Sequence, residues 1–192
     1  MLKIVVIRHF STEGNRNKRY IGITDEPLCE EGKKLVETIS YPQVEAVFAS
    51  PLIRCLETAR LIYRDLTANM IEDLKECNFG EFENKNYLEL SQNENYQAWV
   101  DSNGRLSFPG GEEPEQFKAR TNKAFEKVLE ESIKKGYQSI ALVVHGGTIM
   151  SILERYADPK KDYYHWQVEN GKGYIAYLEE KEGRMINLCS IH

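Results

Sequence analysis

The feature that most constrains this chain is a run of four β-favouring apolar residues, Ile4 to Ile7, which ends directly on Arg8 and His9. An uninterrupted apolar run of this length is typical of a strand that is buried on both faces of a parallel sheet. In open α/β sheets, ligands bind just beyond the carboxyl ends of the strands. The run therefore predicts a central strand that places a cation and an imidazole where a ligand would bind.

A second apolar strand is predicted over residues 140–144, and it ends on His145 and Gly146. Because the carboxyl ends of parallel strands share one edge of the sheet, we expect His9 and His145 to meet there. The N–H groups at the start of the helix that follows favour an anion. Arg54 lies in the first turns of the helix that follows a third, shorter predicted strand, so we expect its guanidinium to reach the same edge.

The residue types that gather at this edge indicate a site for a phosphoryl group or a similar dianion. Arginine suits such a ligand because its planar guanidinium binds two oxygens at once. A lone histidine at a strand end is usually structural, and it is the joint occurrence at three strand-to-helix junctions that points to function. The net charge of −5 gives no general attraction to nucleic acid or to an anionic membrane, so a local cluster of cations has to draw the ligand.

The alternation of predicted strands and helices indicates an α/β fold, a three-layer αβα sandwich with a mainly parallel central sheet. Ser50 is the predicted N-cap of one helix, and Gly136 stops another. The length fits a single domain over residues 1–192, with a helical insertion near residues 84–120 that caps the site as a lid. The aromatic cluster of Tyr163, Tyr164 and Trp166 could line the mouth of a substrate site or an oligomer contact, and core filling is favoured. Helices are predicted over residues 51–64, 84–101 and 114–135.

The cysteines and the apolar stretches narrow the setting of the protein. Cys29, Cys55, Cys77 and Cys189 are scattered without a Cys-x-x-Cys pair, which favours reduced thiols over a disulfide frame or a metal site. The apolar run near the start is too short for the core of a signal peptide, and no apolar stretch is long enough to span a bilayer. We expect a cytoplasmic protein without a metal or cofactor, and without a nucleic-acid or membrane partner.

Several motifs, taken in order, resemble those of the histidine phosphatase superfamily, the phosphoglycerate mutase-like proteins. Arg8 and His9, followed by Ser11 to Asn15, are similar to the opening Arg-His-Gly-Glu-Thr-x-x-x-Asn of that family. The resemblance covers most of residues 2–150 and implies the phosphoglycerate mutase-like fold. The other matching blocks are Arg19 to Gly22, Asp25 to Leu28 with Glu31 and Gly32, Ser50 to Arg54 with Thr58 and Ala59, Leu74 to Glu83, His145 to Gly147, and the set Trp99, Phe108 to Glu112 and Arg120, which resembles the α-ribazole phosphatase-like branch.

The resemblance implies a metal-independent phosphomonoesterase, a histidine acid-type phosphatase that acts on a small phosphorylated metabolite. His9 would attack phosphorus and form a phosphohistidine, while Glu76 would protonate the leaving oxygen and later take a proton from water. Glu81 and Glu83 are alternatives for the acid, although both are expected to be solvated loop charges. The implied phosphate-binding groups, of which Arg8, Arg54 and His145 also act in catalysis, are Arg8, Asn15, Gly22, Arg54, His145 and Gly146.

Phe10 stands where the family has glycine. Its ring could line the pocket, narrow it, or pack beside the strand, and packing is favoured. Two other functions stay open. A phosphoglycerate mutase is one. The resemblance argues against it, because the segment after Glu76 lacks the longer insertion that the mutases have there. A non-catalytic phosphate-binding or regulatory module on the same fold is the other, and Phe10 keeps it open.

Overall fold

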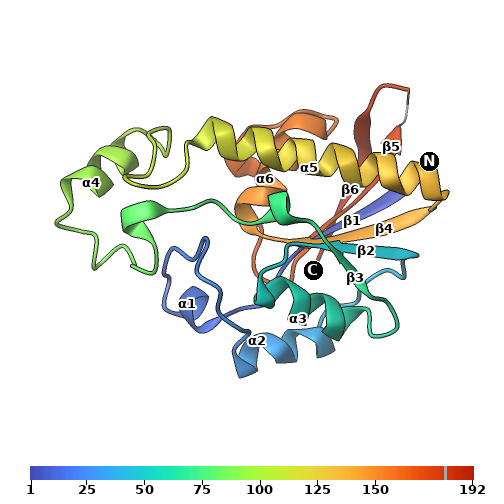
Figure 1. The fold of residues 1–192 in the computed structure, drawn as a ribbon, viewed down its shortest axis with the longest axis horizontal. Helices are drawn as coiled ribbons and strands as arrows, with labels where there is room; N and C mark the ends of the chain where they lie inside the picture. Colours follow the sequence, from blue (N-terminus) through green and yellow to red (C-terminus); the bar gives the residue numbers. More distant parts are fainter. Residues whose placement is uncertain (180) are drawn as a thin grey trace.

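The computed structural model describes residues 1–179 and 181–192, which form a six-stranded sheet between two layers of helices (Figure 1). The strand order is β3-β2-β4-β1-β5-β6. Strands β1 to β4 pair in parallel, and β5 pairs antiparallel with both β1 and β6. The predicted three-layer fold with a mainly parallel sheet is confirmed. The strands are β1 (Leu2–Arg8), β2 (Ala46–Ala49), β3 (Ala68–Met70), β4 (Ser139–Val144), β5 (Gly173–Glu179) and β6 (Arg184–Ile191).

Helices α5 and α6 cover one face of the sheet, and α2 and α3 cover the other (Figure 1). The predicted helix over residues 114–135 is confirmed as α5, which ends at Gly136 in the left-handed conformation (φ 73°) that glycine adopts readily. The helices are α1 (Glu13–Arg16), α2 (Glu30–Lys34), α3 (Ile53–Ile62), α4 (Glu94–Asp101), α5 (Pro114–Lys135) and α6 (Gly146–Tyr156), with short 3-10 turns η1 (Leu35–Glu37), η2 (Glu72–Leu74), η3 (Gly80–Phe82) and η4 (Tyr163–Trp166).

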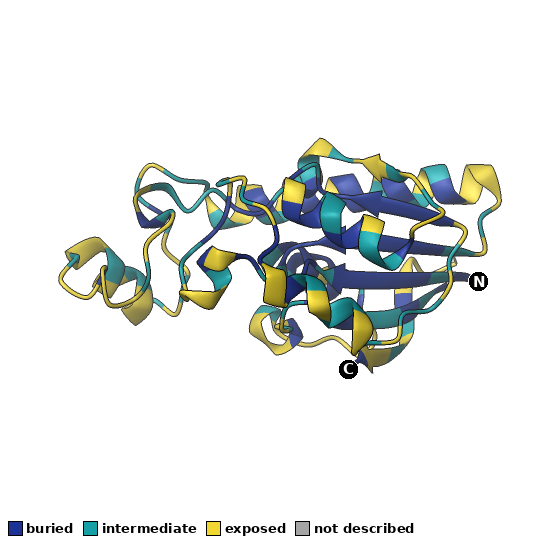
Figure 2. Ribbon diagram, turned by 90° about the horizontal axis from the view of Figure 1, so that it is seen from below, coloured by how far each residue is buried: buried dark blue, intermediate teal, exposed yellow. Residues whose placement is uncertain are grey.

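Strand β1 explains why the sheet has a helical layer on each side. Successive side chains of a strand point to opposite faces, so a continuous apolar run exposes hydrophobic surface on both. Ile4 and Val6 pack in the core cluster that includes α5 and α6, whereas Val5 and Ile7 pack in the cluster that includes α3. All four are fully buried, and the burial of each contributes about 1.5–3 kcal/mol. Figure 2 shows the buried strands enclosed by helices whose outer faces are exposed.

Residues 84–113, here called the cap segment, extend beyond the carboxyl ends of the parallel strands (Figure 1). The predicted helix over residues 84–101 is wrong in length, because only α4 is helical. Asn84 adopts the left-handed conformation (φ 57°), and the Asn86 side chain accepts the backbone N–H groups of two following residues, which favours turns over helix. A hydrophobic cluster, in which three of the buried residues are phenylalanines, packs at the base of the segment. Its buried members are Cys77, Phe82, Leu90, Phe108 and Phe117.

Phe10 packs inside the protein and is fully buried. Its ring lies edge-on to Tyr41, with 6.2 Å between the ring centroids. Gly171 makes room for it, since a Cβ atom there would lie 3.0 Å from the Phe10 ring. The Phe10 N–H donates to Thr58 Oγ1 at 2.9 Å. Of the three interpretations of this residue, the structure shows packing beside the strand.

Phe10→Ala is therefore expected to lower the free energy of unfolding by about 3–5 kcal/mol, because it leaves a cavity in the core. The order of preference among substrates should stay that of the parent, since the ring faces the core. Chemical denaturation and a substrate panel measure the two effects. Tyr87→Ala, at an exposed aromatic of the cap segment, is the control and should change stability by less than about 0.5 kcal/mol. An altered substrate preference at parental stability would contradict the packing role.

Candidate active site

The carboxyl ends of β1 and β4 bring the two predicted histidines together. The imidazole centroids of His9 and His145 lie 5.2 Å apart, and both side chains are buried. His9 Nδ1 lies 2.6 Å from the carbonyl oxygen of Phe10. Because a carbonyl oxygen only accepts, Nδ1 carries the proton and Nε2 keeps its lone pair. The local geometry thus leaves one nitrogen of His9 available for attack.

The charge state of His9 suits a nucleophile. Burial, followed by the guanidinium groups of Arg54 and Arg8, holds the pKa of His9 well below its ordinary value. The pKa of His145 is also well below its ordinary value, through burial first and then through Arg54. Both imidazoles are therefore neutral at neutral pH, so that Nε2 of His9 is free of a proton.

Arg54 is fully buried at the base of the site and ties together three parts of the chain. Its Nη1 donates to the carbonyl of Thr24 and its Nη2 to that of Gly22, both at 2.7 Å. Its Nε donates to His145 Nδ1 at 3.3 Å. Since Nδ1 accepts there, Nε2 of His145 is protonated and donates to the Ser50 hydroxyl at 2.8 Å.

Ser50 was predicted to cap the helix that follows, and this is wrong. The N-cap of α3 is Leu52, and the Ser50 hydroxyl is the partner of His145 instead. The site uses this hydroxyl to fix the tautomer of a buried imidazole.

Gly22 and Thr24 are held between opposite charges. The Oε1 atom of Glu83 accepts their N–H groups at 2.8 and 2.9 Å, while Arg54 takes their carbonyls. The prediction that Glu83 is a solvated loop charge is wrong, because its carboxylate organises this loop. Gly22 was expected to bind phosphate, but both of its backbone groups are engaged within the protein. A Cβ atom at this position would lie 1.9 Å from the carbonyl of Cys77, so only glycine fits.

Glu76 lines the same cavity as His9. One oxygen accepts the N–H of Gly147 and the other that of Cys77, each at 3.0 Å. The side chain is only 7% exposed, and burial raises the pKa of this carboxyl above its usual range, although both N–H groups oppose the shift. A raised pKa keeps the carboxyl protonated to higher pH, as a general acid requires.

Arg120, on α5, braces the segment that carries Glu76. Its Nη1 donates to the carbonyls of Asp73 and Lys75 at 2.9 Å, and its Nη2 donates to that of Glu76 at 3.1 Å. The same guanidinium pairs with Glu112 at 2.7 Å. The position of Glu76 is therefore fixed by a helix that begins at the end of the cap segment.

A cavity of about 720 Å³ opens onto these groups. Arg8 Nε is buried and has no hydrogen-bond partner among the described residues, while Nη1 of the same group donates to Val168 O at 2.7 Å. Because a buried N–H group without a partner is unfavourable, Arg8 Nε can gain free energy by donating to an anionic oxygen of a ligand. Of the predicted site residues, the lining includes Arg8, His9, Asn15, Glu76 and Gly146, whereas Gly22, Arg54 and His145 support it from outside the lining.

The remainder of the cavity is lined by aromatic side chains together with charged ones, and the structure corrects one expectation here. Tyr163 and Tyr164 line the cavity, so the expected core-filling role holds only for Trp166, which is 6% exposed. The cap segment supplies part of the opposite wall through Trp99. The aromatic lining residues are Tyr20, Phe79, Trp99, Phe108, Phe117, Tyr163 and Tyr164.

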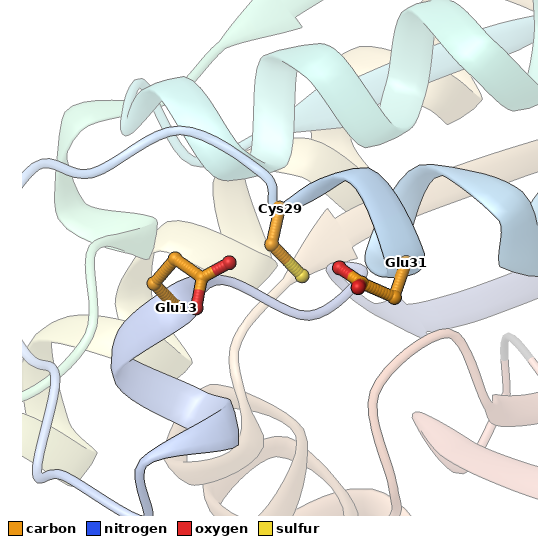
Figure 3. A group of neighbouring side chains, drawn as sticks. All are labelled: Glu13, Cys29 and Glu31. Atoms are coloured by element: carbon orange, nitrogen blue, oxygen red, sulfur yellow. The ribbon is translucent and has the colours of Figure 1, made fainter.

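Glu13, Cys29 and Glu31 form a separate cluster of metal-ligand type, with their donor atoms within 4.8 Å of one another (Figure 3). These donors are already engaged. Arg16 Nη1 pairs with the carboxylates of Glu13 at 3.3 Å and Glu31 at 3.0 Å. Cys29 Sγ donates to the carbonyl oxygen of Ser11 and accepts the backbone N–H of Gly32 in α2. The cluster is accounted for as an anchor between α1 and α2.

The fold and the site together define a protein for phosphoryl transfer at the edge of an α/β sheet. The chain belongs to the histidine phosphatase superfamily (branch 1), whose family model matches residues 4–189. The predicted family is thus confirmed, and so is its phosphatase character. In the part of the chain that the structure describes, none of the helices combines the length and the apolar character that crossing a membrane requires.

Similar proteins include several phosphatases. Adenosylcobalamin/alpha-ribazole phosphatase of Escherichia coli is 28% identical over 88% of this chain and 87% of its own. Phosphoserine phosphatase 1 of Hydrogenobacter thermophilus is 29% identical over 98% of this chain and 92% of its own. The crystal structure of the alpha-ribazole phosphatase from Shigella flexneri has a TM-score of 0.81 at 26% identity, covering 94% of this chain and 92% of that one. A phosphoglycerate mutase from Thermus thermophilus, at 23% identity and a TM-score of 0.73, covers 100% of this chain and 99% of that one and shares the fold.

Proposed function

We propose that this protein is a phosphomonoesterase that hydrolyses a small phosphorylated metabolite through a phosphohistidine at His9. One observation carries the proposal: a neutral histidine and a protonatable carboxyl group, Glu76, line the same cavity as an unsatisfied arginine donor of Arg8. These are the nucleophile, the acid and the anion clamp that transfer of a phosphoryl group needs.

The reaction proceeds in two displacements. Nε2 of His9 forms a bond to phosphorus as the bond to the leaving oxygen breaks, and that oxygen takes the proton of Glu76. Water then attacks the phosphohistidine, giving its proton to the Glu76 carboxylate, and the phosphorus–nitrogen bond breaks to release phosphate and neutral His9. Arg8 and Asn15 stabilise the phosphoryl oxygens through both steps, while Arg54 supports the site from outside the cavity lining through its bonds to His145, Thr24 and Gly22.

The leaving group is proposed to carry a planar ring. A cavity of about 720 Å³ is larger than a phosphate group needs, and it falls in the range typical of small-molecule sites. Its aromatic walls suit a flat partner, and the buried Nε1 of Trp99 has no acceptor among the described residues. The relatives include one named for alpha-ribazole and one named for phosphoserine, and these two names suggest which leaving groups to compare.

The test is hydrolysis of a panel of phosphate monoesters by the purified protein in the presence of EDTA. We expect p-nitrophenyl phosphate to be cleaved, and ring-bearing metabolite esters to exceed phosphoserine in kcat/KM by about tenfold or more. A requirement for added metal would contradict the mechanism, and an inert protein that binds phosphate would favour the regulatory module. Transfer of phosphate within a phosphoglycerate, without its release to water, would favour the mutase.

A further inference from the structure

We infer that Asn170 is a positioning residue of the phosphate site, which orients the side chain of Asn15 so that its NH2 group faces the phosphate. This inference rests on the proposed function, because it concerns how that site holds its anion. Asn170 lies in the loop between η4 and β5, far along the chain from the motifs near His9. The sequence offered no pattern that pointed to it.

The hydrogen bonds of Asn170 fix which way its amide points. Its Nδ2 donates to the backbone carbonyl of His9 at 3.0 Å and to Asn15 Oδ1 at 3.1 Å. A backbone carbonyl only accepts, so the atom of Asn170 that faces His9 has to be the NH2 nitrogen. This bond holds the loop that carries Asn170 against His9, the proposed nucleophile.

The orientation of Asn15 follows from a second backbone group. Its Oδ1 accepts the N–H of Thr12 at 3.3 Å as well as the N–H of Asn170. A backbone N–H only donates, so the atom of Asn15 that faces Thr12 has to be the oxygen. Two donors thus hold Oδ1, one at each side.

This arrangement leaves the Nδ2 of Asn15 for the ligand. Within residues 1–179 and 181–192 no side chain or carbonyl accepts from that nitrogen, and Asn15 lines the cavity together with Arg8 and His9. A flipped amide would turn an oxygen toward the anion and set its NH2 against the two donors that now bind Oδ1. Asn170 therefore selects the orientation that binds phosphate.

Neighbours of Asn170 hold the same region without reaching Asn15. Gly171 N donates to the carbonyl of Arg8 at 3.0 Å, and the carbonyl of Val168 accepts from the Arg8 side chain at 2.7 Å. A purely structural role of the loop would act through these contacts and would displace Arg8 or His9. The proposed role acts through Asn15, whereas the bond of Asn170 to the His9 carbonyl belongs to the structural role, and a double-mutant cycle with Asn15 separates the two.

The experiment compares Asn15→Ala, Asn170→Ala and the double variant, with inorganic phosphate as the calorimetric probe and p-nitrophenyl phosphate as the substrate. Each single substitution should weaken phosphate binding about tenfold, and the double variant should bind no more weakly than Asn15→Ala. The loss should appear in KM and in phosphate affinity more than in kcat. Lys172→Ala, whose side chain pairs with Glu169 at the surface of the same loop, should match the parent.

Losses that multiply in the double variant would overturn the inference, as would a fall in kcat at unchanged phosphate affinity. A parent that binds phosphate but hydrolyses nothing would overturn the proposed function and leave the cycle readable by calorimetry. A parent that binds no phosphate would overturn both. Thermal unfolding of each variant identifies any loss that comes from unfolding, and Asn170→Leu, which is close to asparagine in shape but has neither a donor nor a charge, repeats the test.

Discussion

His9→Ala is expected to lower kcat for p-nitrophenyl phosphate by more than about 10⁴-fold, because it removes the atom that receives the phosphoryl group. His145 cannot take its place. Its Nε2 is protonated toward Ser50, and its Nδ1 accepts from Arg54, so neither nitrogen offers a free lone pair to the cavity. Rapid-quench kinetics with labelled substrate should show an acid-labile, alkali-stable adduct in the parent and none in the variant.

The matched control is His165→Ala. His165 is exposed and stacks edge-on against Trp166, with 5.0 Å between the ring centroids, away from the lining of the site. This variant should keep the parental kcat. Turnover that survives His9→Ala in a folded protein would remove His9 as the nucleophile, and both proteins should unfold at similar temperatures for the comparison to hold.

Glu76→Gln is expected to slow phosphohistidine formation from an alkyl phosphate by about 10²–10⁴-fold, because the leaving alkoxide loses its proton donor. With p-nitrophenyl phosphate, whose leaving group needs no proton, the first displacement should stay close to the parental rate. The phosphohistidine should then accumulate, since the same carboxylate is needed to activate water. A burst of nitrophenolate followed by slow turnover is the signature to measure.

The pH dependence gives this prediction a second readout. Burial raises the pKa of Glu76, so the acid form persists to higher pH than in a solvated glutamate. In the parent, the single-turnover rate with an alkyl ester should fall as the pH rises through that pKa, and Glu76→Gln should lose this limb. Glu81→Gln, at an exposed residue of the neighbouring turn, should retain it. If Glu76→Gln slowed phosphohistidine formation equally from the alkyl phosphate and from p-nitrophenyl phosphate, the result would argue against Glu76 as the acid.

The sequence could predict that the two histidines of the candidate site lie together, because they follow recognisable strands. His9 and His145 each end an apolar run, and parallel strands converge at one edge of the sheet. The structural roles of Glu83, Arg120 and Asn170 could not be found in this way. Their partners are backbone groups of segments that are distant in sequence, and such contacts leave no periodic or spaced pattern in the chain.

The fold shows the same division. The two-faced burial of β1 and the stop of α5 at Gly136 follow from local physics and were predictable. The cap segment was harder, because its Asn84 and Asn86 favour turns within a stretch whose pattern of apolar residues predicted a weakly amphipathic helix. The place of Tyr163 was hidden as well, since composition alone does not distinguish an aromatic that fills a core from one that lines a cavity.

The cap segment packs on the hydrophobic cluster at its base, whereas the nucleophile and its arginines are set by the sheet and the helices on its faces. The cap segment therefore has a hydrophobic cluster of its own beside the two cores of the sheet. Under the proposed function, changes in cap residues such as Trp99 would alter the preference for the leaving alcohol while the displacement at phosphorus is preserved. A chain of this design can change its metabolite over evolution by altering one wall of the cavity, without rebuilding the reaction.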